Sequence, residues 1–309
     1  MEFVHESVML SECIAGLNIN PGGVYVDATL GGGGHSLEIA KRLKGGRLIG
    51  IDKDREAIAA AKKRLAGFED KTVFVNDSFE NLGDILNRLG IDKIDGILFD
   101  LGVSSYQLDA AHRGFSYNKD GRLDMRMSQD ASFDAYQLVN TYDRDKLRQI
   151  LYQYGGEKNA PAIANAICRY REKKPIETTL ELADIIKSTF SPSERYGHKH
   201  AAKRSFQAIR IEVNGELKIL SGTLTTAVER LRPGGRIAVI SFHSLEDKIV
   251  KDTLGILAKG CICDKSKPCV CGRVPQIKAV TRKPVVASAV EAEHNRRAHS
   301  AKLRIYEKL

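Results

Sequence analysis

The chain has 309 residues, of which 42% are hydrophobic and 28% charged, as expected for a globular protein with one large domain or a domain that carries an insertion. No apolar run is long enough to cross a bilayer and the N-terminus does not resemble a signal peptide, so we expect a cytoplasmic protein without a membrane partner. The 48 basic and 39 acidic residues give a net charge of +9, which is compatible with nucleic acid binding but equally with an ordinary basic surface.

Short apolar strands alternate with helical stretches over the first hundred residues and again near the C-terminus. The expected strands are residues 23–28, 47–52, 72–75, 94–100 and 236–242, with weaker ones at 277–280 and 301–306. The expected helices are residues 35–43, 55–65, 82–89 and 246–257, and a long stretch over 201–231 that is broken near Asn214 and Gly215. This alternation predicts an α/β fold in which helices cover both faces of a mostly parallel sheet.

Helical patterns replace the strands between residues 107 and 200. The expected helices there are residues 135–142, 144–154, 161–172 and 180–190, the last with Thr178 as its cap and Glu181 reaching back. A segment of this length is too long for a loop in a compact domain. We therefore expect an inserted helical subdomain at 107–200, with residues 1–106 and 201–309 forming one discontinuous domain.

Four consecutive glycines, Gly31 to Gly34, follow the first expected strand and precede a helix. Without a Cβ atom the backbone can approach a ligand closely, and the helix presents unpaired N–H groups to it. In a dinucleotide site those groups hold a pyrophosphate, whereas S-adenosylmethionine would offer them its carboxylate. The alternative is a tight strand-to-helix turn, but four glycines are more than a turn requires, so the loop favours a ligand.

Two further side chains follow the second and third strands. Asp52 ends the second strand, where an acidic residue holds ribose hydroxyls in nucleotide-binding sheets, although with Asp54 it could instead cap the next helix. Phe79 follows the third strand and could pack against an adenine or belong to the core. Sites for NAD and for S-adenosylmethionine share these elements, so they leave the cofactor open.

The segment Asp100 to Ser105, after the fourth strand, is the most informative one. Ligands of open parallel sheets bind at the carboxyl ends of the strands, where amino methyltransferases place an acidic or amide side chain and a backbone carbonyl. These groups accept hydrogen bonds from an exocyclic amine, which increases the electron density on its nitrogen and aligns it with the methyl group. The alternative is a turn held by local hydrogen bonds of Asp100 and the serines.

Seven motifs spread over the chain resemble those of one family, the bacterial small-subunit rRNA cytosine-N4 methyltransferases (RsmH, or MraW). They are DATLGGGGHS at 27–36, DLGVSS at 100–105, RGFS at 113–116, LDMRM at 123–127, FQAIRI at 206–211, SFHSLED at 241–247 and NRRAHSAKLR at 295–304. The resemblance therefore covers essentially the whole sequence. Tyr106 departs from the family pattern, because a proline usually precedes Gln-Leu-Asp there.

This resemblance implies a class I methyltransferase fold, a Rossmann-like and mostly parallel seven-stranded sheet, with the helical insertion as an RNA-recognition subdomain. It implies that S-adenosyl-L-methionine methylates N4 of one cytidine in the decoding centre of 16S rRNA, within the small ribosomal subunit. Carried over by position, the cofactor contacts fall on Gly33, Gly34, His35, Asp52, Phe79, Asp100 and Gln107.

For catalysis we expect Asp100 and the loop through Ser104 and Ser105 to orient the amine, with the target base flipped into the pocket. His243 follows the buried strand at 236–242 and could accept the proton that the amine loses. A histidine that only holds the loop through hydrogen bonds is the favoured alternative, because the proton can pass directly to water.

Candidate RNA contacts in the insertion are weaker. Arg113 and Arg126 could bind phosphates, and Phe115 or Tyr117 could stack on a base, but a structural role is favoured for each of them. The basic run at 196–204 is a better candidate, although such runs are often only solvated faces.

Four of the six cysteines lie close together as C-x-C-x5-C-x-C, at Cys261, Cys263, Cys269 and Cys271. Four thiolates could hold zinc, but structural zinc sites usually have wider C-x2-C pairs, and this part of the family is variable. The sequence leaves zinc open, and we assign no metal ligand from it.

Two other functional classes fit parts of the pattern. An NAD-dependent oxidoreductase could use the same sheet, but it would have a third small residue of its glycine motif where Ser36 stands. A non-catalytic RNA-binding assembly factor could have kept the fold without the chemistry. The motifs from Asp100 onward favour the methyltransferase over both.

Overall fold

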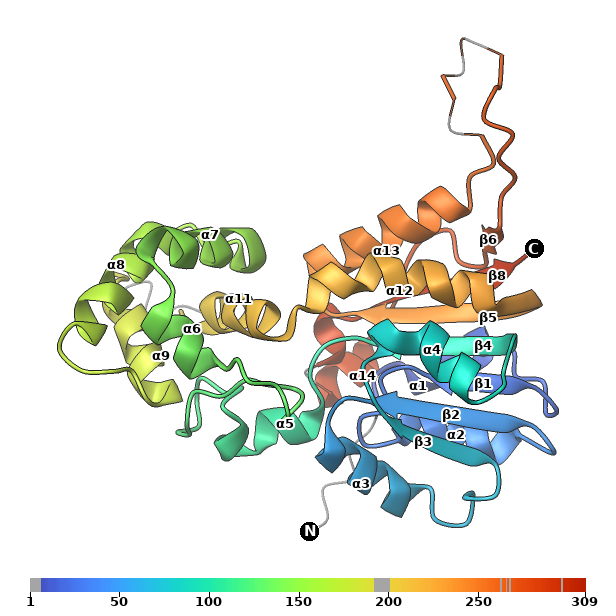
Figure 1. Ribbon diagram of the computed structural model, residues 1–309, viewed down its shortest axis with the longest axis horizontal. Helices are drawn as coiled ribbons and strands as arrows, with labels where there is room; N and C mark the ends of the chain where they lie inside the picture. Colours follow the sequence, from blue (N-terminus) through green and yellow to red (C-terminus); the bar gives the residue numbers. More distant parts are fainter. Residues whose placement is uncertain (1–6, 192–200, 262, 265, 267, 296) are drawn as a thin grey trace. The chain divides into compact units, whose positions relative to one another are not determined.

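The computed structural model describes residues 7–191, 201–261, 263–264, 266, 268–295 and 297–309 (Figure 1). The chain forms two compact units. The first comprises Met1–Gly102 together with Leu217–Leu309, and the second comprises Val103–Glu216. Within the described residues, none of the helices combines the length and the apolar character that crossing a bilayer requires.

The first unit is built on one sheet. Its strands are β1 (Val24–Asp27), β2 (Arg47–Asp52), β3 (Thr72–Asn76), β4 (Ile94–Asp100), β5 (Leu231–Ser241), β6 (Ile277–Ala279), β7 (Val285–Val286) and β8 (Lys302–Lys308). The order is β3-β2-β1-β4-β5-β8-β6, with β7 also paired to β8. The strands β1 to β5 are parallel to one another, and β8 is antiparallel to β5. The predicted mostly parallel sheet is therefore confirmed.

In the described part of the chain the sheet has eight strands and not the seven that the family resemblance implied. β5 pairs with one edge of β8 from Lys302 to Glu307, so β6 and β7 share its other edge. β6 pairs with the end of β8 and β7 with its beginning, and together they fill the seventh position. A strand as short as Val285–Val286 leaves too little periodicity to be recognised in a sequence.

Helices cover both faces of this sheet. They are α1 (Leu10–Leu17), α2 (Gly34–Arg42), α3 (Arg55–Arg64), α4 (Leu82–Arg88), α12 (Glu216–Arg230), α13 (Ser244–Leu257) and α14 (Ala289–His294), with 3-10 turns η1 (Phe79–Asn81) and η3 (Ala298–Ser300). Helices α4, α12 and α13 pack in one apolar cluster and α1, α2 and α3 in another. Successive side chains of a strand point to opposite faces of the sheet. In β4, accordingly, Ile97 belongs to the first cluster and Leu98 to the second.

The second unit is helical. It contains α5 (Ser105–Asp109), η2 (Ala111–Arg113), α6 (Ala135–Thr141), α7 (Arg144–Gly155), α8 (Ala160–Arg171), α9 (Thr179–Ser188) and α11 (Lys203–Asn214). It has its own apolar core, to which Leu138, Ile150, Ile163 and Leu182 contribute. The predicted cap of α9 is confirmed, because Thr178 accepts from the N–H of Glu181 and the Glu181 side chain reaches back to the N–H of Thr178.

The second unit is larger at both ends than the expected insertion at 107–200. The apolar face of α11, with Phe206 and Ile209, belongs to the core of this unit, where α11 packs against α7. The long helix expected over 201–231 is divided as predicted, since α11 ends at Asn214 and Gly215 adopts a left-handed conformation with φ 61°. Of these two helices, α12, which follows the break, packs against the sheet.

Candidate active site

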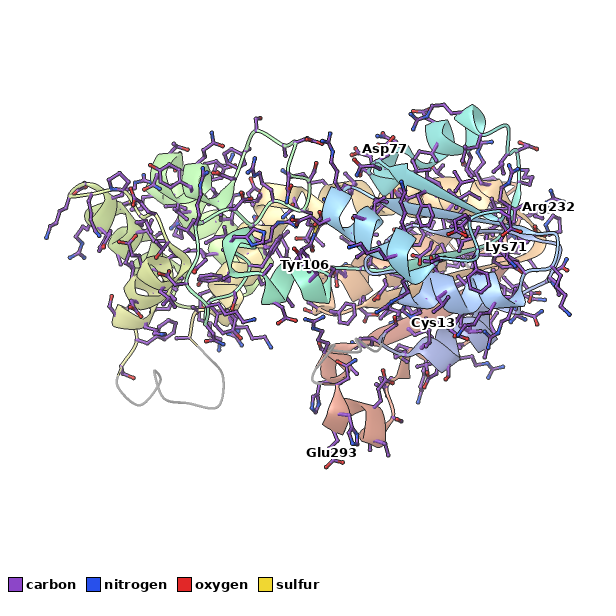
Figure 2. The ribbon with its side chains drawn as sticks, turned by 90° about the horizontal axis from the view of Figure 1, so that it is seen from below. Cys13, Lys71, Asp77, Tyr106, Arg232 and Glu293 are labelled. Carbon is purple, nitrogen blue, oxygen red and sulfur yellow. The ribbon has the colours of Figure 1, made fainter. Side chains whose placement is uncertain are left out.

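The five parallel strands all end in a polar residue, and their carboxyl ends share one edge of the sheet. These residues are Asp27, Asp52, Asn76, Asp100 and Ser241. Figure 2 shows this edge near Asp77, which follows β3, whereas Lys71 before β3 marks the opposite edge. The carboxyl edge of an open parallel sheet is where ligands bind.

A short hydrogen-bond network holds the ends of β1 and β4 together. Asp27 is 1% exposed, and its carboxyl accepts from the Ser36 hydroxyl at 2.7 Å and from the N–H of Thr29 at 3.3 Å. The Thr29 hydroxyl in turn accepts from the N–H of Asp100 at 2.6 Å. Asp27 and Thr29 were not among the predicted site residues. An acidic residue at the end of β1, as at the ends of β2 and β4, was the signal that could have found Asp27.

Asp100 has an unused hydrogen-bond acceptor in a partly enclosed place. Among the described residues no hydrogen-bond partner reaches its buried Oδ1 atom, although 26% of the side chain is exposed. Burial, followed by the charges of Asp27 and Glu246, raises the Asp100 pKa to about 8. The charge of Arg297 opposes this shift. The carboxyl is therefore suited to a ligand that brings a positively charged or N–H donor.

His35 lies beside Asp100 as a neutral ring. Its Nε2 is 3.1 Å from the Val8 carbonyl, so this nitrogen carries the proton and Nδ1 is an acceptor. Nδ1 lies 3.7 Å from Oδ2 of Asp100. Because burial lowers the His35 pKa to about 4, the contact is not an ion pair at neutral pH. The histidine fixes the start of α2 next to the Asp100 carboxyl.

The glycine loop is shaped by close packing as well as by its opening toward a ligand. A Cβ on Gly33 would lie 2.7 Å from Leu65, the residue after α3, and 3.1 Å from Ala61 of α3, and one on Gly34 would lie 1.9 Å from the Ser7 hydroxyl. Gly33 also has φ 76°, which favours glycine. A Cβ on Gly32, by contrast, would meet nothing within 4 Å. Gly33 and Gly34 thus let α2 start close to α3, and Gly32 borders open space.

Asp52 ties the glycine loop to the end of β2. Its Oδ2 accepts from the N–H of Gly31 at 2.8 Å and its Oδ1 from the N–H of Asp54 at 2.9 Å. The N-cap of α3 is Asp54 and not Asp52. Each oxygen of a carboxylate can accept two hydrogen bonds, so both oxygens of Asp52 keep capacity for ribose hydroxyls.

Phe79 is half-buried at the start of η1. Its ring meets the buried ring of Phe99 edge to face, with centroids 5.8 Å apart, and it packs against the core on the side of α4. Part of the Phe79 side chain remains exposed at the carboxyl edge of the sheet. The core role considered for Phe79 is confirmed, and its contact with an adenine stays a prediction.

His243 is the N-cap of α13. Its Nδ1 accepts from the N–H of Glu246 at 3.3 Å, while the Glu246 carboxyl accepts from the N–H groups of Phe242 and His243. Nε2 lies 3.2 Å from Oε1 of Glu246, in an orientation that makes no hydrogen bond. With Nδ1 accepting, the neutral ring has its proton on Nε2, and this leaves no free lone pair for a substrate proton.

The remaining predicted site residues lie in the second unit. Ser104 is the N-cap of α5, where its hydroxyl accepts from the N–H of Gln107 and the Gln107 side chain accepts from the N–H of Ser104. Gln107 is 3% exposed, and Ser105 is the first residue of this helix. The neighbouring Tyr106 is 51% exposed.

The candidate RNA contacts of the insertion have structural roles, as the favoured alternatives predicted. Arg113 is 2% exposed and donates to the carbonyls of residues 126 and 127. Arg126 is paired with Asp124 at 2.6 Å. Phe115 is buried in the core of the second unit, and Tyr117 packs edge to face on Phe206. Residues 196–200 of the basic run lie outside the described residues.

The charges at this edge fit S-adenosylmethionine better than a dinucleotide. Asp27 and Glu246 both raise the pKa of Asp100, so this edge gathers acidic groups that favour a cation over a pyrophosphate. The sulfonium and ammonium groups of S-adenosylmethionine are positively charged. The N-terminus of α2 has no side-chain cap, and Asp52 and Phe79 follow the neighbouring strands at the same edge.

The fold and this edge together define a class I methyltransferase. The family model described as the MraW methylase family matches residues 2–309, and the chain belongs to that family. It is a methyltransferase with S-adenosylmethionine as its methyl donor, as the sequence predicted.

Three curated relatives align over the full length of the chain. A protein of Finegoldia magna is 51% identical over 100% of both chains, one of Carboxydothermus hydrogenoformans is 54% identical over 100% of this chain and 99% of its own, and one of Clostridium botulinum is 53% identical over 100% of both. Each is named ribosomal RNA small subunit methyltransferase H.

Proposed function

We propose that this protein methylates N4 of one cytidine in the decoding centre of 16S rRNA, with the small ribosomal subunit as its substrate. The names of the full-length relatives support small-subunit rRNA as the substrate class. The cytidine amine as the target rests on the motif at 100–105 and on the family resemblance. The observation that carries the proposal is the free acceptor of Asp100 at the carboxyl edge of the sheet.

Asp100 is assigned two neighbouring contacts. One carboxyl oxygen receives the cofactor's ammonium group, and the carboxyl with the following loop, through Ser104 and Ser105, orients the amine. When bound, S-adenosylmethionine supplies an activated methyl group and leaves as the neutral thioether. Thr29 fixes the Asp100 backbone, and His35 limits the positions of its side chain. Holding the two reactants in line accounts for much of the rate enhancement in such a reaction.

We assign His243 a positioning role, in place of the proton acceptor considered from the sequence. Its ring is used to start α13, and the Glu246 held by this cap is one of the charges that raise the Asp100 pKa. The proton from the methylated amine then passes to water. Gly33, Gly34, His35, Asp52, Phe79 and Gln107 are proposed as the residues that bind or shape the cofactor site.

Nucleoside analysis of ribosomes tests this function directly. A bacterial strain that lacks its own enzyme of this family is complemented with the wild-type chain or with Asp100→Asn. The wild-type chain should restore N4-methylated cytidine in 16S rRNA, and the variant should not. Restoration by the variant, or a methyl group on C5 or on the ribose, would contradict the proposal, because the carboxyl would then not act at the amine.

A further inference from the structure

Four cysteine sulfurs converge at one point of the first unit, away from the methyltransferase site. The Sγ atoms of Cys261, Cys263, Cys269 and Cys271 all lie within 4.8 Å of one another. Cys261 and Cys269 are 3.2 Å apart, Cys269 and Cys271 3.7 Å, and Cys261 and Cys271 3.8 Å. No disulfide joins any of the six cysteines, each of which the structure describes.

Two of these separations, 3.7 and 3.8 Å, match the edges of a tetrahedral metal site, and the third, 3.2 Å, is shorter. Four sulfurs at about 2.3 Å from a zinc ion are about 3.8 Å from one another. The N–H of Cys263 also donates to Sγ of Cys261 at 3.3 Å, a contact that stabilises a thiolate at a metal. The narrow C-x-C spacing is no obstacle, because residues two apart point to the same side of an extended chain.

In the segment that carries these cysteines, none of the described residues is buried. It connects Leu257 of α13 to Ile277 of β6 and contains no helix or strand among its described residues. Its described part extends away from the sheet (Figure 1). Val270 is 88% exposed and Val274 is 75% exposed, so these two apolar side chains do not hold the segment in place.

Among the described residues of the segment, backbone hydrogen bonds close its base. The N–H of Gln276 donates to the Leu257 carbonyl at 2.9 Å, and the N–H of Leu309 donates to the Gln276 carbonyl at 3.0 Å. A loop longer than about 12–15 residues without its own secondary structure needs another constraint to keep one conformation. A metal bound by four cysteines would supply it.

The local charge also suits a metal with four thiolates. A Zn²⁺ ion with four thiolates has a net charge of about −2. Residues 259–276 contain four basic residues and one acidic residue. The positive excess of the segment would offset the charge of the metal centre.

We propose that Cys261, Cys263, Cys269 and Cys271 bind one structural Zn²⁺ ion that orders the segment between α13 and β6. All four positions of the metal are filled by protein sulfur, so the site has no place for a substrate and is structural. On binding, the four thiols lose their protons and no redox step is involved.

Metal analysis of the full-length protein tests this proposal. The chain is expressed with zinc in the medium and purified without chelator, and its zinc and iron contents are measured by mass spectrometry. We expect about one zinc per chain in the wild type and in the control Cys168→Ser, whose cysteine lies in the second unit. The double variant Cys261→Ser/Cys269→Ser should lose the zinc.

A second measurement keeps the test valid if the double variant does not fold. A mercurial reagent that titrates the thiols of the wild-type protein should release the zinc into a colorimetric indicator in step with thiol modification. Substoichiometric zinc in the wild type after zinc supply, iron in place of zinc, or full zinc in the folded double variant would overturn the proposal. So would four native thiols that react freely without any metal release.

Discussion

Replacing Asp100 with asparagine tests whether the cofactor needs an ionised carboxyl at this position. Since the Asp100 pKa is raised to about 8, chiefly by burial, the carboxyl of the cofactor-free protein is mostly protonated at pH 7. A cofactor that binds through its ammonium group prefers the ionised form, so binding expels a proton and the affinity increases as the pH rises toward 8.

The size of this effect follows from the pKa. The ionised fraction of a group with this pKa rises about ninefold from about pH 6 to about pH 7, and the ratio of wild-type to variant affinity should rise by the same factor. Above the pKa of Asp100 the variant should bind about 10–100-fold more weakly, which corresponds to the about 1.5–3 kcal/mol of a charge-assisted hydrogen bond.

Calorimetry with S-adenosylmethionine in buffers of different ionisation enthalpy measures both the affinity and the protons released. Titration of the ligand's own amine is common to the two proteins and cancels in their ratio. Circular dichroism confirms that the variant is folded. A ratio that does not change with pH, or equal proton release by the wild type and Asp100→Asn, would refute the assignment of the carboxyl to the cofactor's ammonium group.

Two further pairs of variants separate ligand contacts from structural roles. Asp52→Ala should weaken cofactor binding by about 1–3 kcal/mol, measured by calorimetry. Asp54→Ala should cost about 1 kcal/mol of stability with little loss of affinity, because the Asp54 side chain caps α3. Equal cofactor affinities of Asp52→Ala and Asp54→Ala would show that Asp52 only holds the glycine loop through its hydrogen bond to Gly31. Gly33→Ala should lower the thermal midpoint through its clash with α3 and its positive φ, and Gly32→Ala should leave it nearly unchanged. A similar drop in the thermal midpoints of Gly33→Ala and Gly32→Ala would contradict the inference that Gly33 is closely packed and Gly32 borders open space.

The elements around the site were largely predictable from the sequence. Apolar runs that end in aspartate marked β1, β2 and β4, because a buried parallel strand needs both faces apolar and its carboxyl end can be polar. The helix α1 was missed, and β7 was too short to detect. The cap of α9 was predictable because a capping box is a local contact.

Properties that depend on tertiary packing were not predictable. The sequence shows that α11 is amphipathic, but only the structure shows that its face joins the core of the second unit. Likewise, the sequence favours a ligand at the glycine loop, with contacts at Gly33 and Gly34, whereas the structure shows that these two glycines are also needed for close packing against α3 and Ser7. The convergence of the cysteines depends on the path of an irregular segment, which carries no periodic signal.

The most direct test of the central claim is methyl transfer in vitro with purified components. The protein is incubated with labelled S-adenosylmethionine and small ribosomal subunits that lack the modification, and the labelled nucleotide is mapped. The account predicts one labelled cytidine of the decoding centre, methylated on N4, and no label with Asp100→Asn. An absence of label with the folded wild-type protein, or a methyl group elsewhere than on a cytosine amine, would contradict it.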